Sequence, residues 1–259
     1  MKNSRPDALK GLPILLTRPD AQATEWAQQL LALGAQVQHI PTLAIEPLPG
    51  PVHIETMLSK ADFGVFVSAN AAIALAAAQQ AQGLTLPLVW HCIGKATEKR
   101  ASELGFTVYP NDAIDSETLL QLEIMRNVSG KRCVIVRGQG GRTKLGDTLR
   151  SRGVNVEYCE LYRRDGAWQN AELLASYLRS MTGMPHVILA SSADSLNYTF
   201  LLAEKREMRA NVQQATILVP SKRVAEVAAQ QGARHVLCAE SIRLVDIVAE
   251  LEQWWTKQQ

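Results

Sequence analysis

The chain has few cysteines, no long apolar run and almost no excess of either charge, and each shortage excludes a class of protein. Its 4 cysteines lie far apart without CxxC spacing, which indicates neither a zinc site nor a disulfide framework and favours a reducing, cytoplasmic compartment. A net charge of +2 is too small for nucleic acid to be the expected partner. Any binding of anions must therefore depend on local groups.

Signals for a membrane or a metal are also missing. Segment 1–11 is charged and has no apolar signal-peptide region, and the alanine-rich segment 71–78 is too short to cross a bilayer. The 5 histidines are scattered rather than paired at ligand spacing. We therefore expect neither a membrane nor a metal ion to take part in the function.

Cofactor and nucleophile motifs are incomplete. Segment 138–142 reads Gly-Gln-Gly-Gly-Arg and resembles a phosphate cradle, but it lacks the ending of a P-loop and the third glycine of a dinucleotide fingerprint. A nucleotide- or flavin-binding enzyme is thus the least supported interpretation. The chain has no Gly-x-Ser-x-Gly elbow, and no cysteine is placed with a histidine in a way that would indicate a nucleophile, so covalent catalysis is not expected.

What the chain does contain is an alternation of short β-rich runs with helical stretches. This alternation predicts βα units around parallel sheets, and 259 residues with 47% hydrophobic composition can bury two cores. We therefore predict an α/β protein with two doubly wound sheets. The expected strands are Ile14–Thr17, Gln36–Ile40, Phe63–Val67, Leu88–Ile93, Phe106–Tyr109, Cys133–Val136, Asn155–Cys159, His186–Ala190, Thr216–Val219 and His235–Cys238.

The two halves of the chain align with each other at a nearly constant offset, which indicates an internal duplication. Any two βα units look alike, but here the order of the matches is preserved across a full half. The matched pairs include Arg18 with Arg137 and Thr24 with Thr143 at an offset of 119, Ser68 with Ser191 at 123, and Lys95 with Lys222 at 127 residues.

Two extended segments at equivalent places in the halves predict a two-stranded connector between domains. Segment 41–49 has prolines at 41, 47 and 49, which a central strand does not tolerate, and 160–165 is its counterpart. The chain would leave domain one near Pro41, build domain two and return near Tyr162. The expected division is 1–40 with 166–259 as domain one, 50–158 as domain two, and 41–49 with 159–165 as the connector.

Ligands of open parallel sheets bind beyond the carboxyl ends of the strands. Small hydroxyl residues, glycines and basic residues dominate these places in the chain, a mixture that suits carboxylate or phosphate groups. The hydroxyl residues could also serve only as helix N-caps. Arg18 and Arg137 favour anion binding, because both occupy the same place in each repeat and no cap requires them. Tyr162 could donate a hydrogen bond to a departing hydroxyl, or could simply pack.

An ordered series of short motifs is similar to one known family over nearly the whole chain. The motifs are Leu16-Thr17-Arg18-Pro19, Phe66 to Ala72, Ile93 to Thr97, Asp115 to Leu120, Val136 to Arg142, Leu161-Tyr162-Arg163-Arg164 and Leu189-Ala190-Ser191-Ser192. On these motifs the chain resembles the uroporphyrinogen-III synthases.

The resemblance implies two flavodoxin-like domains joined by a two-stranded ladder, with the active site in a cleft between them. It implies no cofactor, and a monomer is the default expectation. The substrate would be hydroxymethylbilane, a linear tetrapyrrole with eight carboxylates, which loses its terminal hydroxyl and cyclises with inversion of its last ring. A rival hypothesis is a non-catalytic module that binds a tetrapyrrole or another polyanion, since a fold does not certify a function.

The resemblance also carries over individual residues. Tyr162 matches the tyrosine thought to assist loss of the hydroxyl. Relatives often have Thr-Ala where this chain has Ala96-Thr97, which displaces that hydroxyl by one place. The residues implied to hold carboxylates are Thr17, Arg18, Ser68, Ala69, Asn70, Thr97, Arg137, Gly138, Ser191, Ser192 and Ser221.

Overall fold

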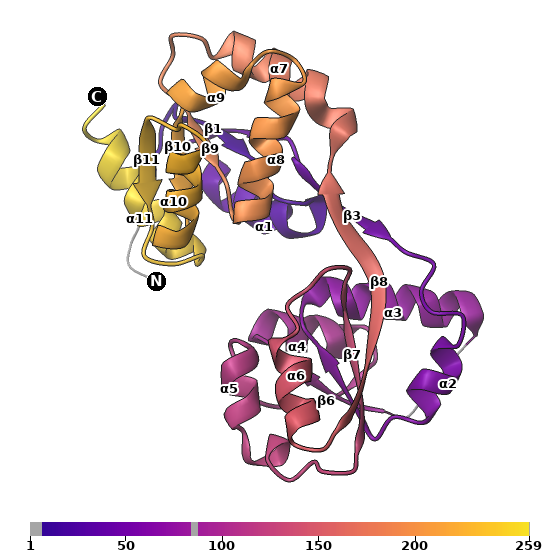
Figure 1. Cartoon of the computed structure of the whole chain (residues 1–259). Coiled ribbons are helices and arrows are strands. Elements are labelled where there is room, and N and C mark those ends of the chain that lie inside the picture. Colours follow the sequence, from indigo (N-terminus) through magenta and orange to yellow (C-terminus); the bar gives the residue numbers. More distant parts are fainter. Residues whose placement is uncertain (1–6, 84–87, 259) are drawn as a thin grey trace. The chain divides into compact units, whose positions relative to one another are not determined.

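The computed structural model describes residues 7–83 and 88–258, and its helices and strands form two compact units (Figure 1). Unit one contains the described residues up to Ala44 together with those from Asp165 onward. Unit two spans Ile45–Arg164. None of the helices in the described part of the chain has the length and apolarity needed to cross a bilayer.

Unit one is built on a five-stranded parallel sheet with the order β11-β10-β9-β1-β2. Counted along the chain, this order is 2-1-3-4-5, the arrangement of flavodoxin-like folds. The strands are β1 (Pro13–Leu16), β2 (Gln36–His39), β9 (Val187–Leu189), β10 (Thr216–Val219) and β11 (His235–Cys238). The helices are α1 (Asp20–Ala32), α7 (Ala171–Ser180), α8 (Ala193–Glu204), α9 (Arg209–Gln214), α10 (Lys222–Gln230) and α11 (Leu244–Trp255), with the 3-10 turn η2 (Trp168–Asn170).

The alternation of side chains along β1 explains why helices cover both faces of this sheet. Ile14 and Leu16 point to one face, where they pack with residues of α1 and α11. Leu15 points to the other face, where it packs with residues of α7, α8 and α10. All three side chains are fully buried. A strand buried on both faces reads as a continuous apolar run, which is how the sequence revealed it.

Unit two contains a six-stranded sheet with the order β3-β8-β7-β4-β5-β6. Its strands are β3 (Leu43–Pro47), β4 (Phe63–Phe66), β5 (Val89–Cys92), β6 (Thr107–Tyr109), β7 (Arg132–Gly138) and β8 (Asn155–Gly166). Its helices are α2 (Ile54–Ser59), α3 (Ala69–Gln82), α4 (Lys95–Glu103), α5 (Ser116–Gln121) and α6 (Lys144–Ser151), with the 3-10 turn η1 (Glu123–Met125). One face packs against α2, α3 and α4, and the other against α5 and α6.

Strand β8 is longer than predicted. The expected strand Asn155–Cys159 and the extended segment 160–165 both lie in one continuous strand of 12 residues that ends at Gly166. At the edge of the sheet β8 lies beside β3, the strand formed within the proline-containing segment 41–49. An edge strand accepts prolines because only one side of it must donate hydrogen bonds to the sheet.

Strand pairing shows that the duplication extends to the register of the sheets. Pro13 lies opposite Gln36 in the pair β1–β2, and the residues 119 positions later, Arg132 and Asn155, lie opposite each other in β7–β8. Counted from β7, the five parallel strands of unit two also follow the order 2-1-3-4-5. The five parallel strands of each sheet therefore comprise two strands of one repeat and three of the other.

The helix N-caps also correct one predicted match between the repeats. Ser68 was paired with Ser191, but Ser68 is the N-cap of α3 and Ser192 is the N-cap of α8. The offset in this part of the chain is thus 124 residues, because one further residue is inserted before α8.

Gly64 provides a test of packing in unit two. A Cβ added to this glycine of β4 would lie 2.3 Å from the Trp90 ring, which stacks on Phe66 with ring centroids 4.0 Å apart. Gly64→Ala should therefore lower the free energy of unfolding by about 1–3 kcal/mol through overpacking, measured by urea denaturation. In a Trp90→Leu background the clash is absent and the same change should cost less. Equal costs in both backgrounds would contradict this interpretation.

His91 of β5 should make the stability of unit two depend on pH. The side chain is 3% exposed, and burial, followed by the positive charge of Lys131, lowers the pKa of His91 to about 4. As the pH falls from about 6.5 to 4, the unfolded chain gains a proton that the folded chain does not, so stability decreases by up to roughly 3 kcal/mol. His91→Phe should remove this loss, measured by denaturation across that pH range. A control, His235→Gln on the surface of β11, should keep the pH dependence of the parent protein.

Candidate active site

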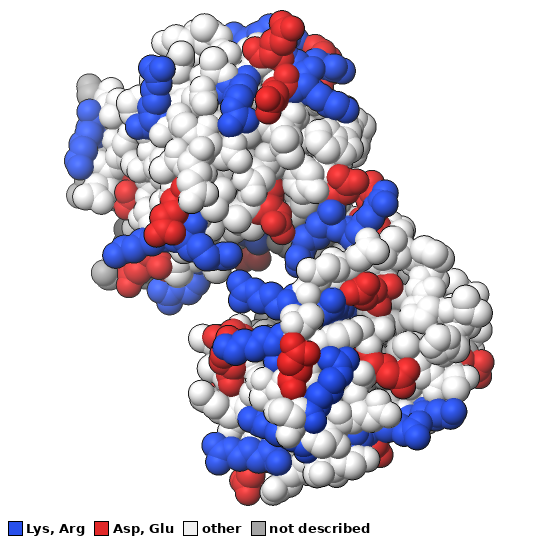
Figure 2. All heavy atoms as spheres, viewed as in Figure 1, with Lys and Arg blue, Asp and Glu red and all other residues white. Residues whose placement is uncertain are grey.

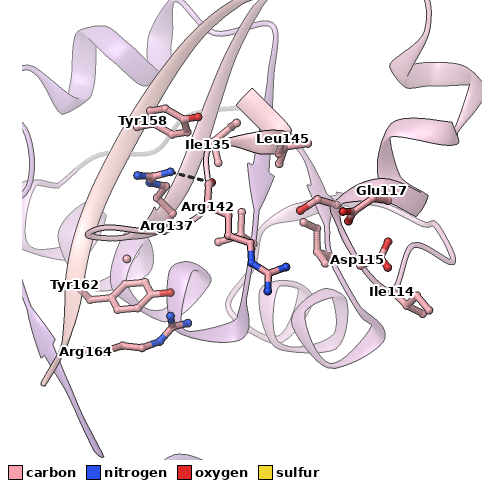
Figure 3. Close-up of a pocket in the computed structure, with 15 residues that line it drawn as sticks. Ile114, Asp115, Glu117, Ile135, Arg137, Arg142, Leu145, Tyr158, Tyr162 and Arg164 are labelled. Atoms are coloured by element: carbon pink, nitrogen blue, oxygen red, sulfur yellow. Dashed lines mark hydrogen bonds between the residues drawn. The ribbon is translucent and has the colours of Figure 1, made fainter. Parts of the chain in front are cut away.

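A pocket of about 320 Å³ lies at the carboxyl edge of the unit-two sheet, where β4, β5 and β7 end (Figure 3). This is the edge at which open parallel sheets bind their ligands. The pocket is lined by Val67, Ile93, Ile114, Asp115, Ser116, Glu117, Ile135, Arg137, Gly138, Gly141, Arg142, Leu145, Tyr158, Tyr162 and Arg164.

A bulge between β7 and β8 places Tyr162 in the pocket wall. Arg137 pairs with Glu160, but the next residue, Gly138, pairs with Tyr162, so one residue of β8 is skipped. A Cβ on Gly138 would lie 2.6 Å from Cε2 of the Tyr162 ring. The absence of a side chain at Gly138 therefore creates the space that the phenol occupies.

The phenol of Tyr162 is held at both ends. Its ring packs on Gly138, and its hydroxyl lies 2.9 Å from the Oγ of Ser68. Ser68 is also the N-cap of α3, because its Oγ accepts a hydrogen bond from the Ala71 amide at 3.2 Å. Tyr162 is only 1% exposed. The hydroxyl oxygen is thus fixed in position, in the wall of a pocket that also contains basic groups.

Arg137 makes internal contacts with each of its three guanidinium nitrogens. The Nε and Nη2 atoms donate to Glu160 at 3.0 and 2.9 Å, and Nη1 donates to the carbonyl of Arg142 at 3.1 Å. The guanidinium also stacks on Tyr158, 4.0 Å from the ring centroid. The hydrogen bond to Arg142 holds the loop after β7. Because Arg137 is only 8% exposed and pairs with Glu160, a substrate carboxylate would have to compete with Glu160 for its guanidinium.

Two arginines outside the predicted set line the same pocket. Arg142 and Arg164 are both exposed, and Figure 3 shows Arg164 extending alongside Tyr162. The sequence contained a signal for Arg164, because residues two apart on a strand point to the same face and Tyr162 lies two positions before it. Exposed guanidinium groups can form bidentate hydrogen bonds with carboxylates.

Acidic groups line the pocket at the start of α5. Asp115 is the N-cap of this helix, and a hydrogen bond from the Thr118 amide lowers the pKa of Asp115. Glu117 pairs with Lys144 at 2.6 Å, which lowers the pKa of Glu117. Both carboxylates are therefore matched by local partners.

The other predicted residues of unit two lie around α3 and α4. Ala69 and Asn70 form the first turn of α3 and are partly exposed. Thr97 is buried in the first turn of α4, its amide donating to the carbonyl of Gly94, and it does not line the pocket. The displaced hydroxyl of the Ala96-Thr97 sequence thus faces the interior of the unit.

Unit one presents its own predicted residues at the carboxyl edge of its sheet. Thr17 is fully buried and donates through Oγ1 to the carbonyl of Leu189 at 3.0 Å, so its hydroxyl joins β1 to β9. The Arg18 guanidinium stacks on Trp26, 3.9 Å from the ring centroid. Burial lowers the pKa of Arg18 to about 10, which leaves it positively charged at neutral pH.

The serines of unit one differ in how their hydroxyls are used. Ser192 forms a capping box with Ser195 at the start of α8. Ser191 precedes it and is partly exposed. Ser221 is the N-cap residue of α10 by position, yet its side chain makes no capping hydrogen bond. Its hydroxyl is therefore not used in capping the helix.

On the faces seen in Figure 2, charges of both signs are interspersed over each unit, in keeping with the small net charge.

Comparison with known proteins gives a consistent result. The family model described as uroporphyrinogen-III synthase HemD matches residues 24–249. The uroporphyrinogen-III synthase of Escherichia coli K12 is 30% identical over 243 residues, covering 89% of this chain and 96% of the relative. That of Salmonella typhimurium LT2 is 32% identical with the same coverage.

Solved structures agree with these relatives at the level of the fold. Uroporphyrinogen-III synthetase from Helicobacter pylori matches with a TM-score of 0.63 at 13% identity, covering 96% of this chain and 100% of that one. A mutant uroporphyrinogen III synthase from the extremely thermophilic bacterium Thermus thermophilus matches with a TM-score of 0.61 at 16% identity, covering 95% and 100%. With a family model that spans most of its length, the chain belongs to the uroporphyrinogen-III synthase family.

Proposed function

We propose that this protein cyclises hydroxymethylbilane to uroporphyrinogen III and that Tyr162 at the carboxyl edge of unit two assists the loss of water. The activity is that of a uroporphyrinogen-III synthase, a hydro-lyase of tetrapyrrole biosynthesis. The observation that carries the proposed site is a phenol fixed in the wall of a pocket that two exposed arginines also line.

The chemistry begins at the terminal hydroxymethyl group of the linear tetrapyrrole. The carbon–oxygen bond breaks as the pyrrole nitrogen supplies electron density, and the oxygen takes a proton and leaves as water. The pyrrole nitrogen then gives up its own proton, which leaves a neutral azafulvene. Attack through a spiro intermediate, fragmentation and reclosure invert the last ring. The net change is the loss of one water, and the substrate supplies most of the reactivity.

Tyr162 is the group proposed to donate the first proton. A phenol can give a proton to the departing hydroxyl and then recover one from the pyrrole nitrogen, so it ends the step unchanged. The close packing on Gly138 restricts the ring, and the Ser68 hydrogen bond restricts the hydroxyl. A restricted donor loses little orientational freedom when the substrate arrives.

Arg142 and Arg164 are proposed to hold substrate carboxylates. Both are exposed and line the pocket beside Tyr162. The partly exposed first turn of α3, with Ala69 and Asn70, adds the positive end of a helix dipole.

The edge of unit one offers further candidates for carboxylate binding, namely Arg18, Ser191, Ser192 and Ser221. Thr17, Thr97 and Arg137 are more deeply buried, and their proposed part is to support these edges.

We further propose that the protein acts as a monomer in the cytoplasm. The 4 cysteines are free thiols, which fits a reducing compartment. Burial raises the pKa of Cys92 and Cys159 to about 12, so these thiols are expected to be unreactive.

Product analysis tests the proposed reaction. Hydroxymethylbilane is mixed with the protein, and the oxidised products are resolved into type I and type III isomers. The protein should yield the type III isomer, whereas a parallel sample without protein should yield the type I isomer. Type I product alone in the presence of protein, together with measurable binding of the substrate, would instead support a binding module.

Tyr162→Phe tests the proposed proton donor. The variant keeps the ring that packs on Gly138 and should therefore fold normally, while kcat for type III formation should fall by roughly 10- to 100-fold. Circular dichroism and the unfolding midpoint check the fold. The matched control is Tyr177→Phe on α7, a partly buried tyrosine of unit one, which should leave kcat unchanged. An unchanged kcat for Tyr162→Phe would remove this residue from the mechanism.

A further inference from the structure

The N-cap of α3 is joined by hydrogen bonds to the proposed proton donor. The Ala71 amide lies 3.2 Å from the Oγ of Ser68, and this Oγ lies 2.9 Å from the hydroxyl of Tyr162. An amide only donates, so the Ser68 oxygen accepts from Ala71. The proton of the Ser68 hydroxyl is then available to the oxygen of Tyr162.

The equivalent cap in the other repeat lacks such a link. Ser192 caps α8, and the third helical residue, Ser195, closes a capping box with it through side chain and backbone. The third helical residue of α3 is Ala71, which has no polar side chain to offer. In unit one the capping side chain thus bonds to its own helix, and in unit two it bonds both to its own helix and to Tyr162 of β8.

We propose that Ser68 is a positioning residue that orients the proton of Tyr162 toward the departing hydroxyl of the substrate. The hydrogen bonds run from the Ala71 amide to Ser68 and from the Ser68 hydroxyl to Tyr162, which leaves the Tyr162 proton for the substrate. This inference rests on the proposed function of Tyr162. Ser68 keeps its own proton throughout, and the proton that reaches the leaving oxygen comes from the phenol.

The direction of this chain favours proton donation for two reasons. Hydrogen bonds in series polarise one another, so a serine that receives an amide hydrogen bond becomes a better donor to the phenol oxygen. The N-terminus of α3 also carries a partial positive charge, which stabilises the negative charge that grows on Tyr162 as its proton leaves. A phenol oriented the other way would donate to Ser68 and have no proton for the substrate.

Three substitutions separate positioning from capping. Ser68→Ala removes both the cap and the hydroxyl, Ser68→Gly removes the hydroxyl but retains most of the capping preference, and Ser68→Thr retains both. We expect kcat to fall roughly tenfold in the alanine and glycine variants, about the rate equivalent of one hydrogen bond. The threonine variant should stay within about twofold of the parent, and KM should change little. Glycine activity equal to that of the parent would show that Ser68 only caps the helix.

A double variant tests whether Ser68 acts through Tyr162. In a Tyr162→Phe background, Ser68→Gly should lower kcat no further, because the hydroxyl that it positions is already absent. A further tenfold loss would overturn the proposal. Failure of the proposed function has a different signature, since the parent protein itself would then form no type III isomer. When the parent does form the type III isomer, an unchanged kcat for Ser68→Gly contradicts the role of Ser68 alone.

Discussion

The close approach of the Tyr162 ring to Gly138 is the contact on which the edge of unit two depends. Because Gly138 has no Cβ, the ring can lie directly against β7, and the bulge shifts β8 by one residue so that Tyr162 faces this space. From there its hydroxyl reaches Ser68. An alanine at position 138 would meet the ring at 2.6 Å and force either the strand or the phenol to move. The pocket wall, the phenol and the cap of α3 therefore form one packed arrangement.

The two repeats have the same arrangement of strands and helices, but equivalent residues make different side-chain contacts. Arg18 and Arg137 are 119 residues apart and both stack on an aromatic ring, Trp26 and Tyr158, and the Arg137 guanidinium also donates to Glu160 of the neighbouring strand. Ser68 and Ser192 both cap helices, but only Ser68 bonds to a tyrosine. Duplication thus preserved the register of the sheets, which backbone hydrogen bonds define, while side-chain partners diverged.

Predictions from the sequence were most accurate where a pattern reports directly on local structure. The strands at 216–219 and 235–238 agree with the structure residue for residue, and most of the others are correct to within two residues at each end. The predicted site residues overlap only in part with the residues that line the pocket. Arg142 and Arg164 line the pocket but were not in the predicted set, and Thr97 was in the set but faces the interior. A residue's place at a strand end indicates the edge where it lies but not which way its side chain points.

The sequence by itself determined the α/β class, the duplication and the edges of the sheets where polar residues gather, because hydrophobic periodicity and motif order are properties of the chain alone. Only the tertiary structure decided which groups are available at those edges. The contact of Gly138 with Tyr162, the pairing of Arg137 with Glu160 and the link from Ser68 to the phenol each join residues that are distant in sequence. Such contacts follow from strand order and from a one-residue shift of register, and neither has a local signature in the sequence.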